Sequence, residues 1–386
     1  MNPPTGPLAG RRVIELAGLG PGPFAAMLLA DLGADVIRVD RLVPGGLRLG
    51  EGDRLDVVNR GKRSIAVDLK SPQGRDVVLA LVATADALIE GYRPGVAERL
   101  GLGPADCFAR NERLVYGRMT GWGQDGPLAS VAGHDIDYIA LSGALWAIGR
   151  PAEVPVAPLN LLGDYAGGSM FLVMGILAAM LEAGQSGKGQ VVDAAMVEGT
   201  AVLTTMFTAL AQMGVWDTSS RGTNPLDSGA PWYDTYACAD GRFVAVGALE
   251  PQFYAQLVEL TGFRLSDPAR LVQPAREHWP AHKQEWAELW RSRTRDEWAE
   301  LLGATDACVQ PVLDWSEREQ HPQALARGSF VSVAGITQPA PAPRLSRTPL
   351  GIHRQPPLRG EHTDEILTDL GLDAAELRSA GVVGSA

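Results

Sequence analysis

Residues 12–41 read RVIELAGLGPGPFAAMLLADLGADVIRVDR, in which two short apolar runs flank a glycine- and proline-rich turn and an apolar helix. Val13–Leu16 and Asp35–Val39 predict strands, and Phe24–Leu32 predicts the helix between them. Gly33 suits the end of that helix, where a residue without a Cβ can adopt a left-handed backbone. A helix between two such runs indicates a parallel strand pair joined by a right-handed crossover.

The α/β pattern continues along the chain. Ser64–Leu69, Asp86–Glu90 and Leu114–Met119 are strand-like, and Gly74–Ala83 is amphipathic and predicts a helix. Such a succession indicates an open α/β layer with parallel strands. Helical patterns then predominate from residue 137 to residue 214.

The sequence pattern then changes, and it predicts a small α+β domain over residues 225–320. Residues 221–231 are turn-rich, and residues 232–249 alternate like a hairpin, with Asp240 and Gly241 as a strong turn signal. Beyond this domain, a proline-rich connector is extended by its composition and leads to a short helical tail. Tryptophan-rich amphipathic helices are predicted over Gln252–Thr261 and Trp286–Leu302.

The composition is that of a globular protein with more than one domain. The chain has 386 residues, of which 46% are hydrophobic and 20% are charged, and its formal net charge is −11. At roughly 100–200 residues per domain, this length accommodates two or three cores. An acidic surface repels phosphate backbones, so we expect no nucleic-acid partner, although a local basic pocket for a small anion is compatible with it.

Cysteine and histidine usage argues against disulfide scaffolds and metal sites. Cys107, Cys238 and Cys308 are far apart and form no CxxC pair, and the chain has no HxxH or HExxH pattern. Few cysteines fit a reducing compartment, and the first residues lack the apolar core of a signal peptide. We therefore expect a cytoplasmic protein without a metal ion.

One apolar stretch resembles a membrane span. Met170–Leu181 reads MFLVMGILAAML, twelve apolar residues flanked by Asp164 and Glu182. Crossing a bilayer takes about 20 residues. We therefore predict a helix buried in a soluble core and no membrane partner.

The turn GLGPGP over residues 18–23 invites a dinucleotide-binding interpretation, because amides at a helix start bind phosphate. Pro23 stands where the GxGxxG pattern needs its third glycine, and Pro21 and Pro23 remove two amide donors. The alternative to an NAD site is a tight strand-to-helix turn.

Three side chains are candidates for acid–base chemistry. Asp164 begins an apolar helix, where the dipole favours the carboxylate and burial opposes it, unless it is a plain N-cap. His134, between a glycine-rich loop and an apolar helix, can exchange a proton near neutral pH, unless it is a satisfied, partly buried histidine. Glu250 follows an apolar strand and either orients a histidine or caps the next helix.

Positive charge concentrates in the first α/β layer of this acidic chain. Several of these residues follow strand ends, where open α/β sheets bind ligands, so the cluster suits a polyphosphate ligand. Taken one at a time, each residue is better explained as a solvated surface residue. The residues are Arg38, Arg41, Lys62, Arg63, Lys70, Arg93 and Arg99.

Motifs from the first strand to the last helix carry a resemblance to a known family. The chain resembles the family III CoA-transferase superfamily and, within it, the α-methylacyl-CoA racemases. The matching segments include GRRVIELAGLGPGPFAAMLLADLGADVIRVDR, SIAVDLKSPQG, ALIEGYRPGVAERLGLGP, RMTGWGQDGP, AGHDIDYIALSGALWAIGR, PLNLLGDYAGGSMFLVMGILAA, GKGQVVDAAMVEG and GEHTDEILTDLGL.

The resemblance implies an α/β fold with a Rossmann-like large domain, a smaller α+β domain and an interlocked homodimer. The large domain would span residues 1–190 and be completed by residues 325–386, with a linker helix over residues 191–224. The ligand would be an acyl-CoA thioester, with no separate cofactor because coenzyme A is part of the substrate.

The resemblance also assigns site residues. His134 and Asp164 match the catalytic pair, which would invert C2 of a 2-methylacyl-CoA through an enolate, and Glu250 matches the acid that supports the histidine from the other subunit. A backbone N–H near Asp164 is the expected donor to the enolate oxygen. The residues that match CoA-thioester contacts are Arg41, Val67, Asp68, Leu69, Lys70, Gly91, Tyr92, Arg93, Arg99, Gly133, Asp135, Ile136, Asp137 and Tyr138.

A second functional class shares this fold. In CoA-transferases of the superfamily, the residue that matches Asp164 is a nucleophile that forms a mixed anhydride with an acyl group. His134 marks the racemase branch, and residues 226–231 lack the glycine run common in the transferases. A non-catalytic CoA-binding protein is disfavoured because both catalytic positions are filled.

Overall fold

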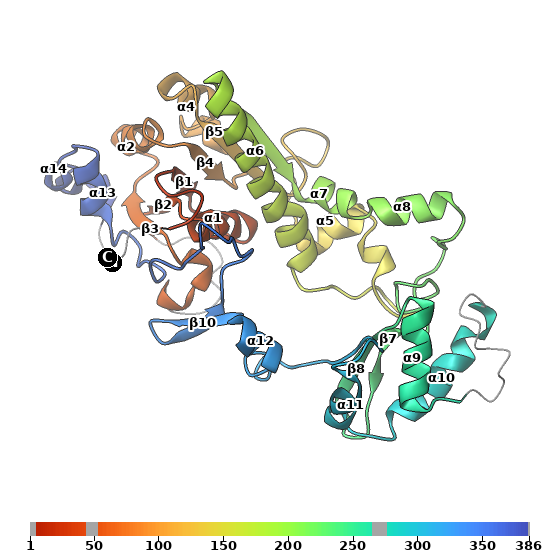
Figure 1. Cartoon of the computed structure of the whole chain (residues 1–386). Coiled ribbons are helices and arrows are strands. Elements are labelled where there is room, and N and C mark those ends of the chain that lie inside the picture. The colour runs from red at the N-terminus through yellow and green to blue at the C-terminus, as the bar shows by residue number, and fades with distance from the viewer. Residues whose placement is uncertain (1–4, 44–52, 265–275, 385–386) are drawn as a thin grey trace. The chain divides into compact units, whose positions relative to one another are not determined.

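The computed structural model divides the chain into two units, each described here by itself (Figure 1). The structure describes residues 5–43, 53–264 and 276–384. The large unit comprises Met1–Ser142, Leu159–Leu203 and Ala326–Ala386, and the small unit comprises Gly143–Pro158 and Thr204–Leu325.

A seven-stranded sheet forms the centre of the large unit. Its order is β12-β3-β2-β1-β4-β5-β6, and all neighbours are parallel except β12, which pairs antiparallel with β3. The predicted parallel pair is therefore confirmed, with Val13 opposite Val36. The strands are β1 (Arg12–Leu16), β2 (Asp35–Arg41), β3 (Arg63–Val67), β4 (Ala87–Glu90), β5 (Val115–Thr120), β6 (Val191–Ala195) and β12 (Val383–Gly384).

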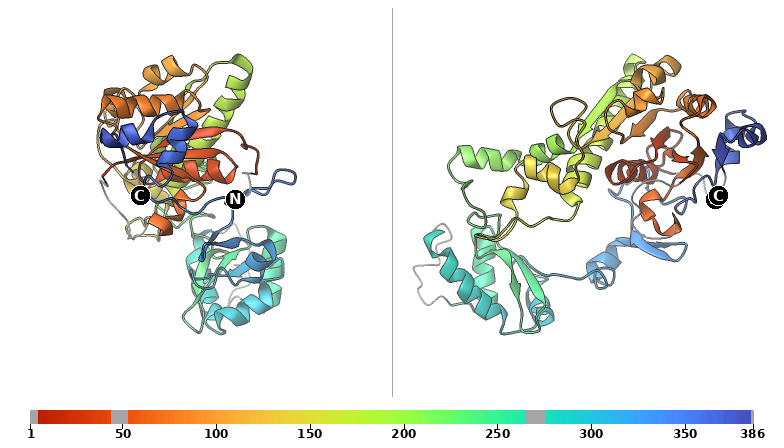
Figure 2. Two further views of the ribbon diagram at one scale, coloured as in Figure 1. Left: turned by 90° about the vertical axis from the view of Figure 1, so that its left-hand side faces the viewer. Right: turned by 180° about the vertical axis from the view of Figure 1, so that it is seen from behind.

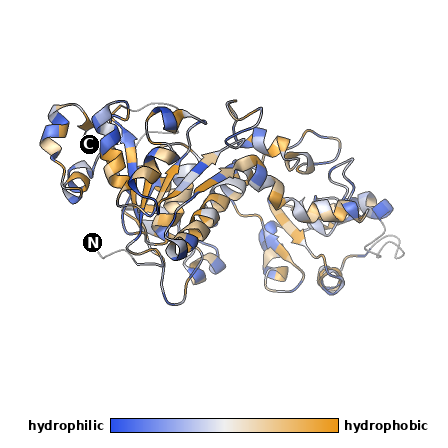
Figure 3. Ribbon diagram, turned by 90° about the horizontal axis from the view of Figure 1, so that it is seen from above, coloured by the Kyte–Doolittle hydropathy of each residue, from blue (hydrophilic) through white to orange (hydrophobic). Residues whose placement is uncertain are grey.

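Helices cover both faces of this sheet, because alternate side chains of each strand point to opposite faces. On β1, Ile14 packs into one apolar cluster and Val13 into the other. The first cluster includes side chains from α2 (Pro72–Val82), α4 (Pro104–Arg110), α13 (Thr363–Asp369) and α14 (Ala374–Ser379), and the second includes side chains from α1 (Pro21–Asp31) and α6 (Met170–Ser186). Figure 3 shows the apolar strands between these helices.

The apolar helix is longer than the sequence predicts. A π-helical segment, η4 (Leu161–Ser169), runs directly into α6, so that residues 161–186 form one apolar helix of 26 residues. Its length and composition would suffice to cross a membrane, a test that core helices also pass. In the large unit one face of α6 packs on the sheet, where Gly175 faces Val192 so closely that a Cβ would lie 2.5 Å from a valine methyl.

The expected linker helix over residues 191–224 is wrong at its start. Residues 191–195 form β6, which pairs with β5 from Tyr116 to Thr120 and so completes the sheet. Valine, which occupies the first two positions of β6, has a high strand propensity. The edge of β5 that faces away from β4 also needs hydrogen-bond partners for its backbone N–H and C=O groups. Two helices follow, α7 (Met196–Leu203) in the large unit and α8 (Thr205–Gln212) in the small unit.

The small unit has a three-stranded antiparallel sheet, β7-β8-β9, with helices packed against it (Figures 1 and 2). The predicted hairpin is confirmed, and Gly241 has a φ of 75° in its turn. Its core is rich in aromatic rings, with Trp286, Trp290 and Trp298 at most 1% exposed. The elements are β7 (Tyr233–Ala237), β8 (Phe243–Gly247), β9 (Val309–Pro311), α9 (Pro251–Thr261), α10 (Trp279–Trp290) and α11 (Arg295–Leu302).

The single helix predicted over Trp286–Leu302 is two helices. A second N-terminus forms at Thr294, whose hydroxyl accepts the N–H of Glu297, while the Glu297 carboxylate accepts the N–H of Thr294 at 2.8 Å. This reciprocal capping satisfies amides that a helix start leaves unpaired, so it stabilises the break. The remaining α-helices and strands of the described residues are α3 (Val96–Arg99), α5 (Asp135–Leu141), α12 (Pro322–Arg327), β10 (Phe330–Val333) and β11 (Ile336–Pro339).

Candidate functional site

The candidate CoA contacts follow the carboxyl ends of neighbouring parallel strands. Arg41 ends β2 opposite Val67 at the end of β3, and residues 91–93 follow β4. Parallel strands end at one edge of the sheet, which is where open α/β sheets bind ligands. The residues there differ in exposure, because Val67 and Leu69 are buried in the core and can offer only backbone atoms, whereas Lys70 is exposed.

Two of these segments meet through their side chains. Burial raises the pKa of the Tyr92 phenol, and the nearby Arg41 guanidinium opposes that rise. The backbone N–H of Tyr92 donates to Glu90 at 2.6 Å, and Glu90 accepts a further bond from Arg118 at 3.0 Å. The buried ion pair between Glu90 and Arg118 therefore anchors the start of the loop that follows β4. Arg93 and Arg99 remain exposed beside it.

The segment after β3 is a turn into α2. Asp68 accepts the N–H of Lys70 at 3.0 Å, and Ser71 caps the helix by accepting the N–H of Gly74 at 3.0 Å. The Asp68 side chain thus shapes the turn, while the Lys70 side chain is free to reach a ligand phosphate.

His134 and Asp164 lie at two helix starts that are tied together. His134 precedes α5 and donates its backbone N–H to Asp137 at 2.9 Å. The next residue, Asp135, is 6% exposed, and its Oδ2 accepts the N–H groups of Gly163 at 2.6 Å and Asp164 at 2.7 Å. One carboxylate therefore joins the start of α5 to η4, and brings together residues thirty positions apart in sequence.

Asp164 is not a helix cap. The capping position of η4 belongs to Asn160, and Asp164 lies in the first turn of the π-helical segment, a backbone form frequent at functional sites. Burial raises the pKa of Asp164, with Asp135 adding to the rise, while the amide of Asn160, at 3.1 Å from Oδ2, and the His134 imidazole oppose it. A half-buried carboxyl under these opposing influences suits proton transfer.

Tyr138 lies on α5, the same helix as Asp135, and packs against the loop that precedes this helix. Its hydroxyl donates to the carbonyl of Gly133, and its ring packs edge-to-face on Trp122 at 4.8 Å. Burial, followed by the charge of Asp164, raises the pKa of Tyr138 to about 12. Tyr138 is therefore a neutral hydrogen-bonding group, while Ile136 is 47% exposed on the other side of α5.

Glu250 lies in the small unit, at the position that precedes α9. Its side chain is exposed and makes no capping hydrogen bond to that helix. The interpretation as a plain cap is therefore wrong, and its support of His134 stays a prediction.

Several residues that contact or face Asp164 were not predicted from the sequence. Asn160 is four positions before Asp164, a spacing that places both on one helix face and could have revealed the contact. Gly20, with a φ of 72°, faces the carboxylate so closely that a Cβ would lie 3.3 Å from Oδ2. Phe24 stacks on Tyr165 with ring centroids 4.3 Å apart. The turn before α1 thus faces a protein carboxylate, which favours the tight turn over a phosphate site.

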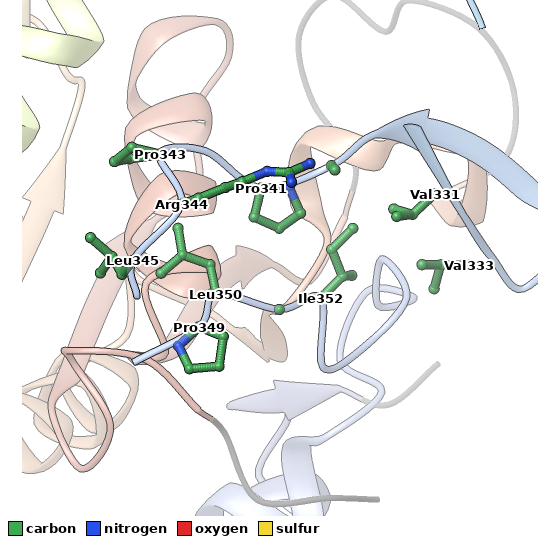
Figure 4. A pocket seen from close by; sticks show the side chains of 11 residues that line it. Val331, Val333, Pro341, Pro343, Arg344, Leu345, Pro349, Leu350 and Ile352 are labelled. Carbon is green, nitrogen blue, oxygen red and sulfur yellow. The ribbon is translucent and has the colours of Figure 1, made fainter. Parts of the chain in front are cut away.

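Two further features belong to other parts of the structure. Among residues 5–43, 53–264 and 276–384, no group of three or more His, Cys, Asp or Glu side chains is placed to hold a metal ion. An open apolar pocket of about 490 Å³ lies between β10 and the proline-rich connector, lined by residues such as Val331, Pro341 and Leu350 (Figure 4). None of the predicted site residues lines it.

Comparison with known proteins tests the resemblance. The family described as CoA-transferase family III matches residues 8–363. The chain is 45% identical to α-methylacyl-CoA racemase of Homo sapiens over 96% of this chain and 95% of the relative, and 46% identical to that of Mus musculus over the same shares. A crystal structure of a CAIB/BAIF family protein from Brucella suis aligns with a TM-score of 0.80 at 26% identity, covering 95% of this chain and all of that one. The predicted resemblance is confirmed, and the chain belongs to CoA-transferase family III.

Proposed function

We propose that this chain is a racemase that interconverts the (2R) and (2S) forms of 2-methylacyl-CoA thioesters. The observation that carries the proposal is the junction of α5 and η4, where the carboxylate of Asp135, the residue after His134, accepts the backbone N–H of Asp164 at 2.7 Å. The 45% identity to the human racemase along nearly the whole chain supports the same activity.

The reaction needs two proton-transfer groups. A thioester carbonyl acidifies the adjacent C2–H but leaves it a weak acid, so one group must remove the proton and another must return a proton to the opposite face. His134 and Asp164 fill these roles and exchange them for the other enantiomer. The raised pKa of Asp164 brings its acid and base forms closer together in energy near neutral pH, which favours both directions.

The CoA part of the substrate binds at the carboxyl edge of the sheet. Arg41, Lys70, Arg93 and Arg99 are exposed cations there and neutralise phosphate oxygens. The strand order 3-2-1-4-5-6 within the large sheet supports the Rossmann-like description of this unit. No further cofactor takes part, because the acidified C2–H belongs to the thioester itself.

The active form is a homodimer, and the second copy covers an apolar face of the long helix. Leu172, Val173 and Ile176 on one face of α6 are buried, whereas Met170, Met174 and Leu181 on the other face are 52–72% exposed. A helix apolar on both faces needs a partner on each. Glu250 of one chain then supports His134 of the other. The protein acts in the cytoplasm on fatty acyl thioesters, without a membrane or nucleic-acid partner.

The experiment is proton exchange at C2, followed by proton NMR in D₂O over a panel of 2-methylacyl-CoAs. The C2–H signal should disappear, and His134→Ala and Asp164→Ala should each slow its loss by roughly 10²–10⁴-fold. His321→Ala, which alters a partly exposed histidine of the small unit, is the matched control and should exchange C2–H like the unaltered chain. An undiminished C2–H signal after long incubation refutes the racemase.

The transferase that shares this fold makes a different prediction from the same carboxylate. It would exchange CoA between a thioester and a free acid, and hydroxylamine would trap an acylated Asp164 during turnover. We expect no trapped Asp164 while C2 exchange proceeds. Acyl exchange together with trapping would replace the racemase by the transferase.

A further inference from the structure

Asp135 makes contacts that a residue binding CoA would not need. Its Oδ2 accepts two backbone N–H groups, those of Gly163 and Asp164, at 2.6 and 2.7 Å. The residue is 6% exposed, and its other oxygen, Oδ1, is buried without a hydrogen-bond partner in the described structure. The side chain thus points at the backbone that carries Asp164.

The contact depends on the absence of a side chain at residue 163. A Cβ on Gly163 would lie 2.7 Å from Oδ2 of Asp135, so glycine lets the carboxylate reach the amides. Two N–H groups converging on one anionic oxygen form strong, charge-assisted bonds, which fix the backbone of Asp164 relative to α5. His134 is the residue before Asp135, so the same carboxylate relates both acid–base groups.

A buried carboxylate oxygen without a partner costs stability, and such costs are concentrated at functional sites. A negative charge in this place would also repel the phosphates of CoA. Both observations argue against a direct contact between the Asp135 side chain and the CoA moiety. They favour a role toward Asp164.

We propose that Asp135 is a positioning residue, whose carboxylate holds the amides of Gly163 and Asp164 and thereby sets the placement of Asp164 against His134. The proposal rests on the racemase function and deepens it. The same contact occupies the N–H of Asp164, which the sequence suggested as a donor to the enolate oxygen, with the carboxylate of Asp135.

The pKa of Asp164 can be followed in the pH profile of C2 exchange, which gives the test a second measurement besides the loss of activity. His134 and Asp135 from α5 act on the Asp164 carboxyl, Asn160 bonds to it from its own helix, and Tyr138 is coupled to it. Asp135 raises the pKa of Asp164, so removing the charge but keeping an oxygen acceptor should lower that pKa.

The test compares Asp135→Asn with Asp135→Ala. Asparagine can still offer an oxygen to both amides, so we expect kcat for C2 exchange to fall less than tenfold and the limb of the pH profile due to Asp164 to move to lower pH. Alanine releases the amides, and a displaced catalytic group lowers kcat by about 10²-fold, with KM nearly unchanged. Asp76→Asn, an exposed aspartate of α2, should alter neither quantity.

Amide hydrogen exchange separates this proposal from the proposed function. In the peptide spanning residues 161–169, mass spectrometry should show at least tenfold faster exchange in Asp135→Ala and near-normal exchange in Asp135→Asn, whatever the enzyme catalyses. An unaltered peptide in Asp135→Ala overturns the proposal, as does a raised KM with unchanged kcat. Wild-type protein that leaves C2–H intact would instead refute the racemase and leave this positioning role to the exchange data.

Discussion

Replacing Arg118 by methionine should destabilise the large unit through a single buried carboxylate. Arg118 Nε lies 3.0 Å from Glu90 Oε1, and its Nη2 lies 2.8 Å from Glu98 Oε1. The Glu90 side chain is 1% exposed, whereas that of Glu98 is 44% exposed. Methionine keeps much of the apolar contact of the arginine stem, so the change mainly removes the charge.

The magnitude follows from this difference in exposure. Leaving a buried charge without its partner costs about 3–5 kcal/mol, while a pair as exposed as that with Glu98 contributes about 0–1 kcal/mol. We therefore expect Arg118→Met to lower the free energy of unfolding by about 3–5 kcal/mol. Adding Glu90→Gln should restore most of the loss, since glutamine needs no counter-charge and can still accept the N–H of Tyr92.

The pH dependence has a defined sign. Burial raises the pKa of Glu90, and the Tyr92 amide and Arg118 oppose that rise, so without Arg118 the pKa rises further. A carboxyl whose folded pKa lies above its unfolded value favours the fold most below the unfolded pKa, and that contribution is lost as pH rises through the folded pKa. The deficit of Arg118→Met should therefore shrink on acidification.

Urea unfolding at pH 8 and pH 5 measures both effects through the shift of the midpoint at constant slope. Arg75→Met, which removes an exposed cation next to Asp76, is the control and should change stability little. A deficit below about 1 kcal/mol, the value of an exposed pair, would refute the reasoning. So would a deficit that is equal at both pH values, or a double variant as unstable as the single one.

Three other perturbations probe the core, a helix crossing and the site. Trp286→Ala should cost about 3–5 kcal/mol in the small unit, measured by chemical unfolding, because the ring is fully buried and stacked 3.7 Å from a phenylalanine ring. Gly199→Ala should lower the melting temperature, since its Cβ would lie 1.8 Å from a carbonyl oxygen of η4, whereas Gly184→Ala meets nothing within 4 Å and should be neutral or stabilising. Asn160→Ala removes a bond that favours the carboxylate, so the pKa of Asp164 should rise and the pH profile of C2 exchange should move to higher pH; an unmoved profile would contradict that contact.

Local patterns in the sequence were sufficient for much of the fold. The alternation around residues 13–16 and 35–39 and the glycine-rich turn between them determine a parallel pair, because each strand must bury both faces under helices. Asp240-Gly241 likewise determines a hairpin, since its turn needs a glycine at positive φ. The motifs also identified the family.

Two other features were predicted wrongly, one because its partner is distant in the chain and one because a local helix start was overlooked. Residues 191–195 are a strand because β5 offers them an unpaired edge, and the long tryptophan-rich helix divides because Thr294 and Glu297 cap a second start. The edge of β5 is not visible in a local window around residues 191–195, so the helical pattern led to a wrong prediction there. Thr294 and Glu297, in contrast, form a local T-x-x-E capping signal inside the predicted helix, and the helical periodicity around it concealed the break.

The sequence alone supplied the candidates for proton transfer, among them the imidazole of His134 and the carboxyl group of Asp164 in two separate motifs. Only the tertiary structure decided that Asp135 links those motifs, by seating its carboxylate on the amides of Gly163 and Asp164. The physical reason is that periodicity and turn chemistry act between near neighbours. A buried charge must instead form hydrogen bonds with the donors that the folded chain places next to it, and these can come from any part of the sequence.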